Sequence, residues 1–120
     1  MTGVTKFPQQ KSIQTLLILT NLPDRQSANE MAKVLIEERL AACVNILGDC
    51  SSVYRWEGKI ENATEVPMLI KTRADCYQQV EQAIKRLHPY ELPEIIAVPI
   101  VEGLPNYLKW VHEQTSPASE

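Results

Sequence analysis

The stretch Tyr54-Arg55-Trp56-Glu57-Gly58-Lys59-Ile60 predicts a β-hairpin, because it centres a glycine between two charged residues at a turn. Alternation along the strand puts Tyr54 and Trp56 on one side and Arg55 on the other, so the two aromatic rings form one patch. A lone hairpin cannot bury such a patch, and aromatic residues are enriched at the centres of interfaces. We therefore expect this patch to contact a partner subunit or to line a pocket.

Short apolar runs on both sides of this hairpin predict the strands of a sheet. The expected strands cover residues 13–20, 43–47, 51–57, 65–72 and 94–101. Gly48-Asp49 predicts a bend between the second and third of these runs, and the polar stretch 59–64 separates the third from the fourth. Pro67 and Pro99 cannot donate to a strand ladder. We therefore expect Pro67 near the start of its strand, at an edge or beyond the main sheet, and Pro99 at an edge or at a break in its strand.

Apolar residues at helical spacing predict two helices between these strands. The first covers about residues 25–41 and starts at Asp24 or at a capping box that begins with Ser27. The second is expected to be capped by Asp75 and to stop at His88, because the residue before a proline avoids helical geometry.

The order of elements is therefore β-α-β-β-α-β, followed by a short C-terminal helix after the turn at 103–105. This order predicts an α+β fold, a ferredoxin-like sandwich in which two helices cover one face of an antiparallel sheet. A chain of 120 residues has room for one core, which we place at residues 13–114 with flexible tails at 1–12 and 115–120.

Composition excludes several classes of function. Twelve basic and fifteen acidic residues give a net charge of -3, and the basic residues are dispersed, which disfavours nucleic-acid binding. Residues 1–12 hold no apolar block typical of a signal peptide, and no apolar run is long enough to cross a bilayer. We expect a cytoplasmic protein without a membrane partner. The chain shows no catalytic signature, so we expect neither an enzyme nor a firmly implied cofactor.

Three cysteines, Cys43, Cys50 and Cys76, lie too far apart for a C-x-x-C metal motif. An odd number of cysteines cannot all pair within one chain. A reducing compartment is therefore the simplest expectation.

Five clusters of residues together are typical of one known family. They are Leu40-Ala41-Ala42-Cys43-Val44-Asn45, Tyr54-Arg55-Trp56-Glu57-Gly58-Lys59, Glu65-Val66 through Lys71-Thr72, His88-Pro89-Tyr90-Glu91-Leu92-Pro93-Glu94, and Tyr107-Leu108-Lys109-Trp110. Over residues 13–114 the chain resembles the CutA family of divalent-cation tolerance proteins. The resemblance implies a ferredoxin-like protomer in a tight homotrimer, with the long hairpin in subunit contact and an architecture similar to PII-like signalling trimers. It also implies a link to the tolerance of divalent metals, copper especially.

Two residues are candidate metal ligands. Cys43 opens a strand after a helix end, where its thiol either packs in the core or serves as a soft ligand for copper. His88 stands at a helix C-terminus, where the ring is often accessible to a ligand, or where it caps a free backbone carbonyl.

A second set of residues forms candidates for a cleft between subunits. The cleft or ligand candidates are Tyr54, Trp56, Glu57, Lys59, Glu65, Lys71 and Tyr90, and the interface candidates are Tyr54, Trp56 and Trp110. Glu57 and Lys59 form either a solvated pair or, in a subunit cleft, a partly desolvated one with Glu65 and Lys71 as further partners.

Two functions remain open from the sequence. The first is a homotrimeric CutA-type protein of metal tolerance that binds copper or another divalent cation. The alternative is a PII-like sensor or adaptor that binds a small anion or a partner protein at its subunit clefts.

Overall fold

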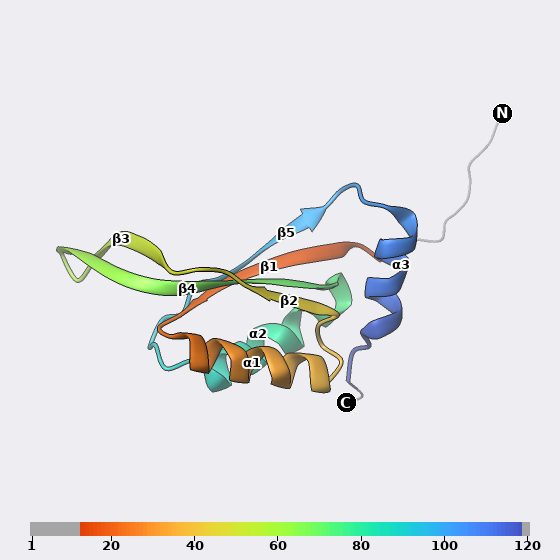
Figure 1. The fold of residues 1–120 in the computed structure, drawn as a ribbon, viewed down its shortest axis with the longest axis horizontal. Helices are drawn as coiled ribbons and strands as arrows, with labels where there is room; N and C mark the ends of the chain where they lie inside the picture. The colour runs from red at the N-terminus through yellow and green to blue at the C-terminus, as the bar shows by residue number, and fades with distance from the viewer. Residues whose placement is uncertain (1–12, 119–120) are drawn as a thin grey trace.

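The structure, a computed structural model, describes residues 13–118 as an antiparallel sheet with three helices (Figure 1). The strands are β1 (Thr15–Leu22), β2 (Cys43–Ile46), β3 (Cys50–Trp56), β4 (Lys59–Arg73) and β5 (Ile95–Ile100). The helices are α1 (Arg25–Glu37), α2 (Tyr77–Leu87) and α3 (Pro105–Gln114), and a short 3₁₀ turn, η1 (Ala74–Cys76), precedes α2. None of the helices in residues 13–118 is long and apolar enough to span a membrane.

The strands follow the order β2-β4-β1-β5, and β3 continues beyond β2 as a second partner of β4. Every pair is antiparallel. The β3–β4 hairpin extends past the helices, so the molecule is elongated and measures 59 × 30 × 28 Å (Figure 1). The α+β class is confirmed.

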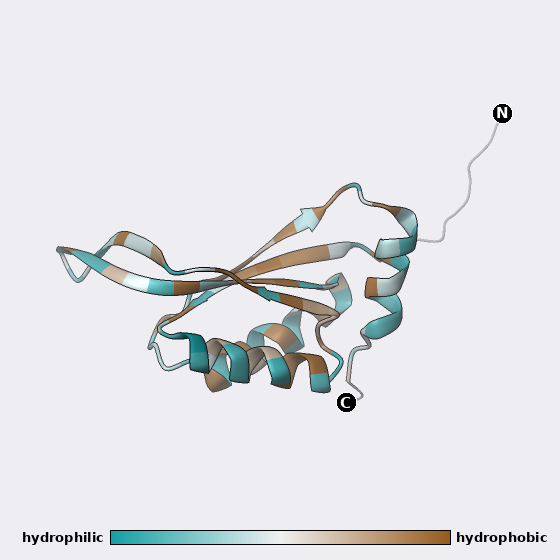
Figure 2. Ribbon diagram, in the orientation of Figure 1, coloured by the Kyte–Doolittle hydropathy of each residue, from teal (hydrophilic) through white to brown (hydrophobic). Residues whose placement is uncertain are grey.

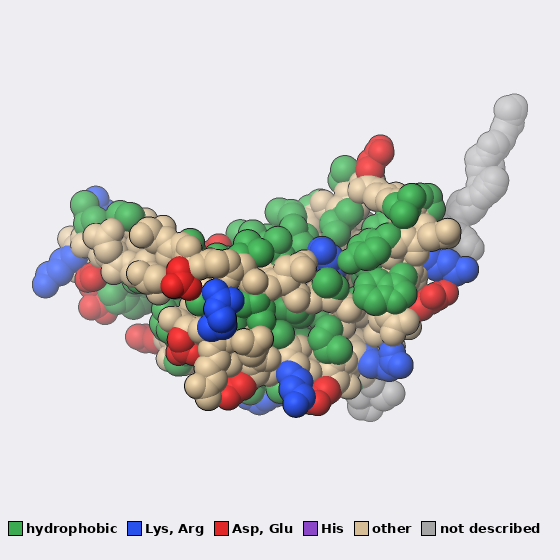
Figure 3. All heavy atoms as spheres, in the orientation of Figure 1, with side chains coloured by type: hydrophobic (Ala, Val, Ile, Leu, Met, Phe, Trp, Pro, Cys, Tyr) green, Lys and Arg blue, Asp and Glu red, His purple; other side chains and the backbone are tan. Residues whose placement is uncertain are grey.

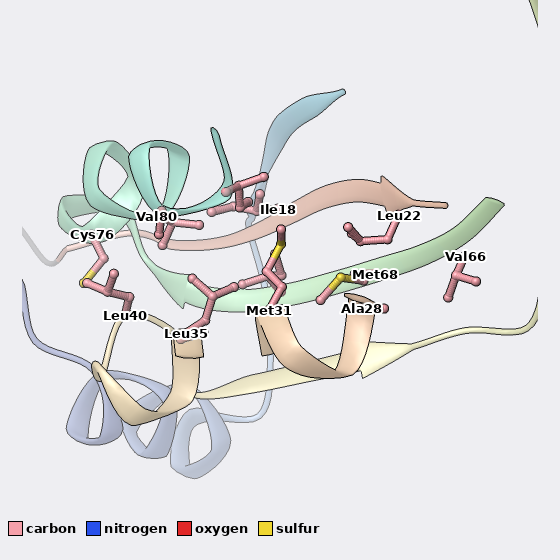
Figure 4. Packing of buried hydrophobic residues seen from close by; sticks show 14 residues of the cluster. Ile18, Leu22, Ala28, Met31, Leu35, Leu40, Val66, Met68, Cys76 and Val80 are labelled. Carbon is pink, nitrogen blue, oxygen red and sulfur yellow. The ribbon is translucent and has the colours of Figure 1, made fainter. Parts of the chain in front are cut away.

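The core lies between the sheet and the helices α1 and α2 (Figure 4). Alternate residues of β1 and β4, such as Ile18 and Ile70, point to this face and pair across the strands. They pack against the apolar stripe of α1, which includes Met31 and Leu35. Apolar residues at every second position of the strands and at a spacing of about 3.6 positions in the helices therefore pack together in one buried layer.

The opposite face of the sheet, here called the open face, is apolar as well. Its central residues are Leu17, Leu19, Leu69, Ile96 and Val98, which the register places side by side. Ile96 is 50% and Val98 44% exposed. Helix α3 contacts β1 and β4 at one end of the sheet (Figure 1). Hydrophobic residues run along the strands (Figure 2), and the space-filling view shows hydrophobic side chains over the sheet and beside α3 (Figure 3).

The hairpin is tighter than predicted, because β4 begins at Lys59 and not at residue 65. Glu57 (φ 51°) and Gly58 (φ 81°) both adopt positive φ, which is the backbone of a two-residue type I′ turn. Trp56 therefore pairs directly with Lys59, and the polar stretch 59–64 belongs to the strand. These residues lie beyond the helices, where neither side of the hairpin is buried in the core. They therefore lack the alternation of apolar and polar residues by which a strand is predicted from sequence.

Pro67 was expected near a strand start or an edge, but it lies inside β4. The Pro67 carbonyl accepts a hydrogen bond from the Leu47 N–H (2.9 Å). The Pro67 nitrogen points to the same side of β4, toward the segment between the end of β2 and the start of β3. The predicted bend at Gly48 thus provides the gap that a proline without an N–H requires. Pro99 does lie on an edge strand, β5.

The helix ends also differ from the predictions. Asp24 caps α1 by accepting from the Ser27 N–H (2.8 Å), and α1 ends at Glu37 because Arg39 takes a left-handed φ of 60°. Asp75 does not cap α2. Its carboxylate instead receives two hydrogen bonds from Arg73, at 2.8 and 2.7 Å.

The predicted C-terminal tail is anchored where the structure describes it. Thr115 is buried, and its hydroxyl donates to the Val111 carbonyl (2.8 Å). The Ser116 N–H donates to the Arg39 carbonyl, and Ala118 exchanges two hydrogen bonds with Gln79. The predicted tail at 1–12, and residues 119–120, lie outside the described residues.

Candidate functional site

A cleft of about 1060 Å³ lies between the base of the β3–β4 hairpin and the loop that leads into β5. We call it the Tyr90 cleft. Its lining consists of Asn21, Ser52, Val53, Tyr54, Trp56, Glu65, Pro89, Tyr90, Glu91, Leu92, Pro93, Glu94, Ile95 and Ile96. Four of the predicted cleft residues, Tyr54, Trp56, Glu65 and Tyr90, are therefore brought together.

The hairpin register explains why its three residues share the cleft. Cys50 lies opposite Glu65, and Trp56 lies opposite Lys59, so residues of even number on β3 share a face with residues of odd number on β4. Tyr54, Trp56 and Glu65 therefore point to the same side. This arrangement depends on the two-residue turn, because a slip of one residue would send Glu65 to the other face.

His88 fixes the loop that carries Tyr90. The Tyr90 N–H donates to His88 Nδ1 (3.1 Å), which leaves the ring proton on Nε2, and Nε2 lies 2.6 Å from the Asn21 carbonyl that accepts it. The rings of His88 and Tyr90 are 4.7 Å apart. The Asn21 side-chain amide donates to Glu94 Oε1 (3.0 Å) and ties the far end of the loop to β1.

Two roles were left open for His88, an accessible metal ligand or a side chain that bonds a free backbone carbonyl. The ring is only 8% exposed and both of its nitrogens are hydrogen-bonded, one of them to the Asn21 carbonyl and not to a carbonyl of the preceding helix. It is also remote from the other predicted metal ligand. Cys43 pairs with Lys71 on β4, whereas the Asn21 carbonyl that His88 contacts pairs with Pro67. Lys71 and Pro67 are four residues apart on β4, which corresponds to roughly 13 Å along the strand. In residues 13–118 no group of three or more His, Cys, Asp or Glu side chains is placed to hold a metal ion.

The remaining predicted residues lie elsewhere. Glu57 and Lys59 form the hairpin tip and do not line the Tyr90 cleft. Lys71 is on the open face, where its ammonium donates to Asn45 Oδ1 (2.9 Å) and lies 5.8 Å from the Tyr107 ring centre. Trp110 lines a separate hollow of about 410 Å³ with residues of α1 and of the segment that follows it.

The cysteines show no sign of a shared site. Cys43 and Cys50 are partly buried, with sulfur contacts of 3.9 Å to Asn45 Oδ1 and 3.8 Å to Ser52 Oγ. Cys76 is fully buried in the core, and this burial raises the pKa of its thiol. Cys76 is therefore a packing residue.

Charge in the Tyr90 cleft has one sign. Among residues 13–118, Glu65, Glu91 and Glu94 are its only ionisable residues besides the tyrosines, and no Lys, Arg or His from this part of the chain lines it. Glu65 is 7% exposed and forms no ion pair within residues 13–118. The pKa of Tyr90 is raised, first by burial of its phenol and then by the adjacent Glu65 carboxylate. The phenol therefore keeps its proton beside the carboxylate.

Sequence reasoning missed Asn21 as a loop anchor. The residue was part of a turn signal after the first strand, and nothing local connects it with His88 and Glu94, about seventy positions later. Only the antiparallel return of β5 beside β1 brings them together.

A family model, "CutA1 divalent ion tolerance protein", matches residues 16–114. The chain belongs to the CutA1 family. It is 43% identical over 99 residues to the divalent-cation tolerance protein CutA of Thermus thermophilus, a match that covers 82% of this chain and 96% of that protein. It is 41% identical over 98 residues to protein CutA of Homo sapiens, which covers 82% of this chain but only 55% of the human protein.

Solved CutA1 structures share the fold as well. The Thermus thermophilus protein superposes with a TM-score of 0.83 at 42% identity, over 85% of this chain and 99% of that one. The CutA1 of Oryza sativa gives a TM-score of 0.85 at 35% identity, over 88% of this chain and 97% of that one. The family resemblance read from the five clusters is therefore confirmed.

Proposed function

We propose that this CutA1 family member acts in the tolerance of divalent cations, copper among them, as a homotrimer of ferredoxin-like protomers whose ligand site is the Tyr90 cleft. Family membership supports the link to divalent cations. The apolar open face and the unpaired edge of β5 support assembly, because exposed strand edges and apolar patches favour association.

The observation that carries the site is the buried carboxylate of Glu65. Burying a carboxylate without an ion-pair partner is costly even where a phenol lies beside it, and a bound cation offsets that cost. Glu91 and Glu94 add negative charge at the same cleft. This charge favours a cationic ligand over the small anion of the sensor hypothesis.

The donor set fits hard cations better than copper. Carboxylate oxygens suit hard divalent ions, whereas copper prefers thiolate or imidazole ligands. Cys43 does not line the cleft, and the His88 ring already uses both nitrogens. If copper binds directly, its thiol ligand lies outside the Tyr90 cleft.

Calorimetric titration with Cu²⁺, Zn²⁺ and Mg²⁺ tests this proposal. We expect saturable binding that Glu65→Gln weakens by about tenfold, equivalent to about 1.4 kcal/mol. Cys43→Ser serves as the comparison for copper, and Glu113→Gln, on the solvent side of α3, as the control. Absence of binding by every metal would reject direct cation binding. Equal binding by Glu65→Gln would reject the cleft as the site.

A further inference from the structure

Glu65 and Lys71 lie on the same face of β4. This strand directs its even-numbered residues, such as Met68 and Ile70, to the core, so its odd-numbered residues point to the open face. The two charged residues are six positions apart, which corresponds to roughly 20 Å along the strand. Within one chain they are therefore too far apart to form an ion pair.

Each of these two side chains carries a charge without a counter-charge. Neither forms an ion pair with any residue in 13–118. Glu65 is buried beside the Tyr90 phenol, and the Lys71 ammonium contacts neutral groups, Asn45 Oδ1 at 2.9 Å and the Tyr107 ring at 5.8 Å. The open face therefore holds a negative charge at its hairpin end and a positive charge at its α3 end.

The surface around these charges is apolar. Leu69 lies between them on β4, and the register places Leu17 and Val98 in line with Lys71. A second copy packed on these residues would remove water from the carboxylate and from the ammonium. Because a desolvated charge without a partner is strongly unfavourable, such an interface requires a counter-charge for each of them.

A threefold ring brings opposite ends of neighbouring protomers together. In a heterologous contact one patch of a protomer meets a different patch of the next, and the ring closes when every protomer uses both patches once. The β3–β4 hairpin and α3 lie at opposite ends of this protomer, which is 59 Å long (Figure 1). A head-to-tail ring joins the hairpin end of each protomer to the α3 end of the next.

We propose that, in the homotrimer, Glu65 of each protomer forms an ion pair with the partner subunit's Lys71. The proposal rests on the homotrimer of the proposed function, and it identifies a residue that a second copy contributes to the Tyr90 cleft. The partner's Lys71 supplies the positive charge that residues 13–118 of the same chain do not place there. A metal ion at Glu65 then competes with this ammonium.

Exchange of the two charges in the full chain tests the proposal by sedimentation. Glu65→Lys and Lys71→Glu each place like charges at the contact, so each should shift the protein from trimer toward monomer. The double variant with both substitutions again has opposite charges and should restore the trimer. Because the two positions are roughly 20 Å apart in one chain, restoration requires contact between copies. Glu30→Lys, the same change of charge on the exposed side of α1, should remain trimeric.

A milder set of variants serves if Glu65→Lys does not fold, as thermal unfolding shows. Glu65→Gln and Lys71→Met should each raise the protomer concentration of half-dissociation by about tenfold or more. The variant with both substitutions should lose little beyond either single one, because neither charge is then left unpaired. A folded exchange variant that stays dissociated, additive losses in the milder set, or no effect of any substitution would overturn the proposal.

The oligomeric state and the metal titrations separate this proposal from the proposed function. A trimer that is insensitive to Glu65 and Lys71 would overturn the ion pair and leave the function in place. Where a metal binds at Glu65, Lys71→Met should tighten its binding by several-fold, since the competing ammonium is removed, and equal affinity would contradict the pair. A trimer restored by the charge exchange, without metal binding, would support the pair and reject direct cation binding.

Discussion

Thr20 and Thr72 are buried threonines on the same face of the sheet, but their hydroxyl groups differ in hydrogen bonding. Thr72 Oγ1 donates to the Leu40 carbonyl (2.6 Å), whereas Thr20 Oγ1 has no partner within residues 13–118. Replacing Thr20 by the isosteric valine removes a desolvated hydroxyl, so Thr20→Val should raise the free energy of unfolding by about 1 kcal/mol. Thr72→Val should lower it by about 1 to 2 kcal/mol.

Chemical denaturation of the two variants beside the unsubstituted protein measures both effects. The two substitutions remove the same atoms at the same depth, so each serves as the control for the other. Equal changes in the free energy of unfolding would contradict the account.

The Asp75 carboxylate should make the free energy of unfolding weakly dependent on pH in the acidic range. The hydrogen bonds from Arg73 are the main cause of its lowered pKa, so the carboxylate is deprotonated more readily in the folded chain than in the unfolded one. This contribution is complete above the unfolded pKa, near 3.9, and is lost as pH falls through the folded pKa. Because both side chains are partly exposed, Asp75→Asn should cost no more than about 1 kcal/mol at neutral pH and nothing at low pH.

Unfolding measured in steps from neutral pH down to about pH 2, well below the ordinary Asp pKa, follows this loss. Asp49→Asn is the control, because Asp49 lies 3.5 Å from Arg25 in a far more exposed pair. A loss for Asp75→Asn of the same size at both ends of this pH range would show that packing, and not charge, is responsible.

Among the elements, the β3–β4 hairpin depends most on its turn. Gly58 has a φ of 81°, and a Cβ there would meet no atom within 4 Å. The cost of Gly58→Ala is therefore conformational only, about 1 kcal/mol. Gly48→Ala is the matched control, since Gly48 also has open space but no positive φ.

We expect Gly58→Ala to increase amide hydrogen exchange in residues 50–65 and to weaken ligand binding in the Tyr90 cleft, because the turn sets the hairpin register. Gly48→Ala should change neither. Unchanged exchange in Gly58→Ala would mean that the strand pairing, and not the turn, holds the register.

For the whole molecule, the open face predicts association. Ile96 and Val98 lie on the edge strand β5 and expose about half of their surface, so a charge there should oppose the burial of this face against a second copy. We expect Val98→Lys to shift the mass in sedimentation from three protomers of 13.6 kDa toward one. Gln82→Lys, on the exposed side of α2, is the control and should remain trimeric.

A monomeric unsubstituted protein at micromolar concentration would contradict the trimer. A Val98→Lys variant that stays trimeric would place the interface away from the open face.

The sequence alone determined what depends on local periodicity. Alternation in β1 places Ile18 on an apolar face, and helical spacing in α1 does the same for Met31 and Leu35. The hydrophobic effect then packs the two faces together. Local residue chemistry also marked Gly48 as a break and Tyr54 and Trp56 as one patch. The five clusters of residues were sufficient to predict the family.

The tertiary structure decided everything that depends on residues distant in the chain. It buried His88 against Asn21, separated Cys43 from it, and placed Lys71 on the open face. It also left Glu65 buried beside Tyr90, without an ion pair to any residue in 13–118. Such properties follow from strand register and loop packing across distant positions, and no local pattern encodes the charge balance of a cleft that four segments form together.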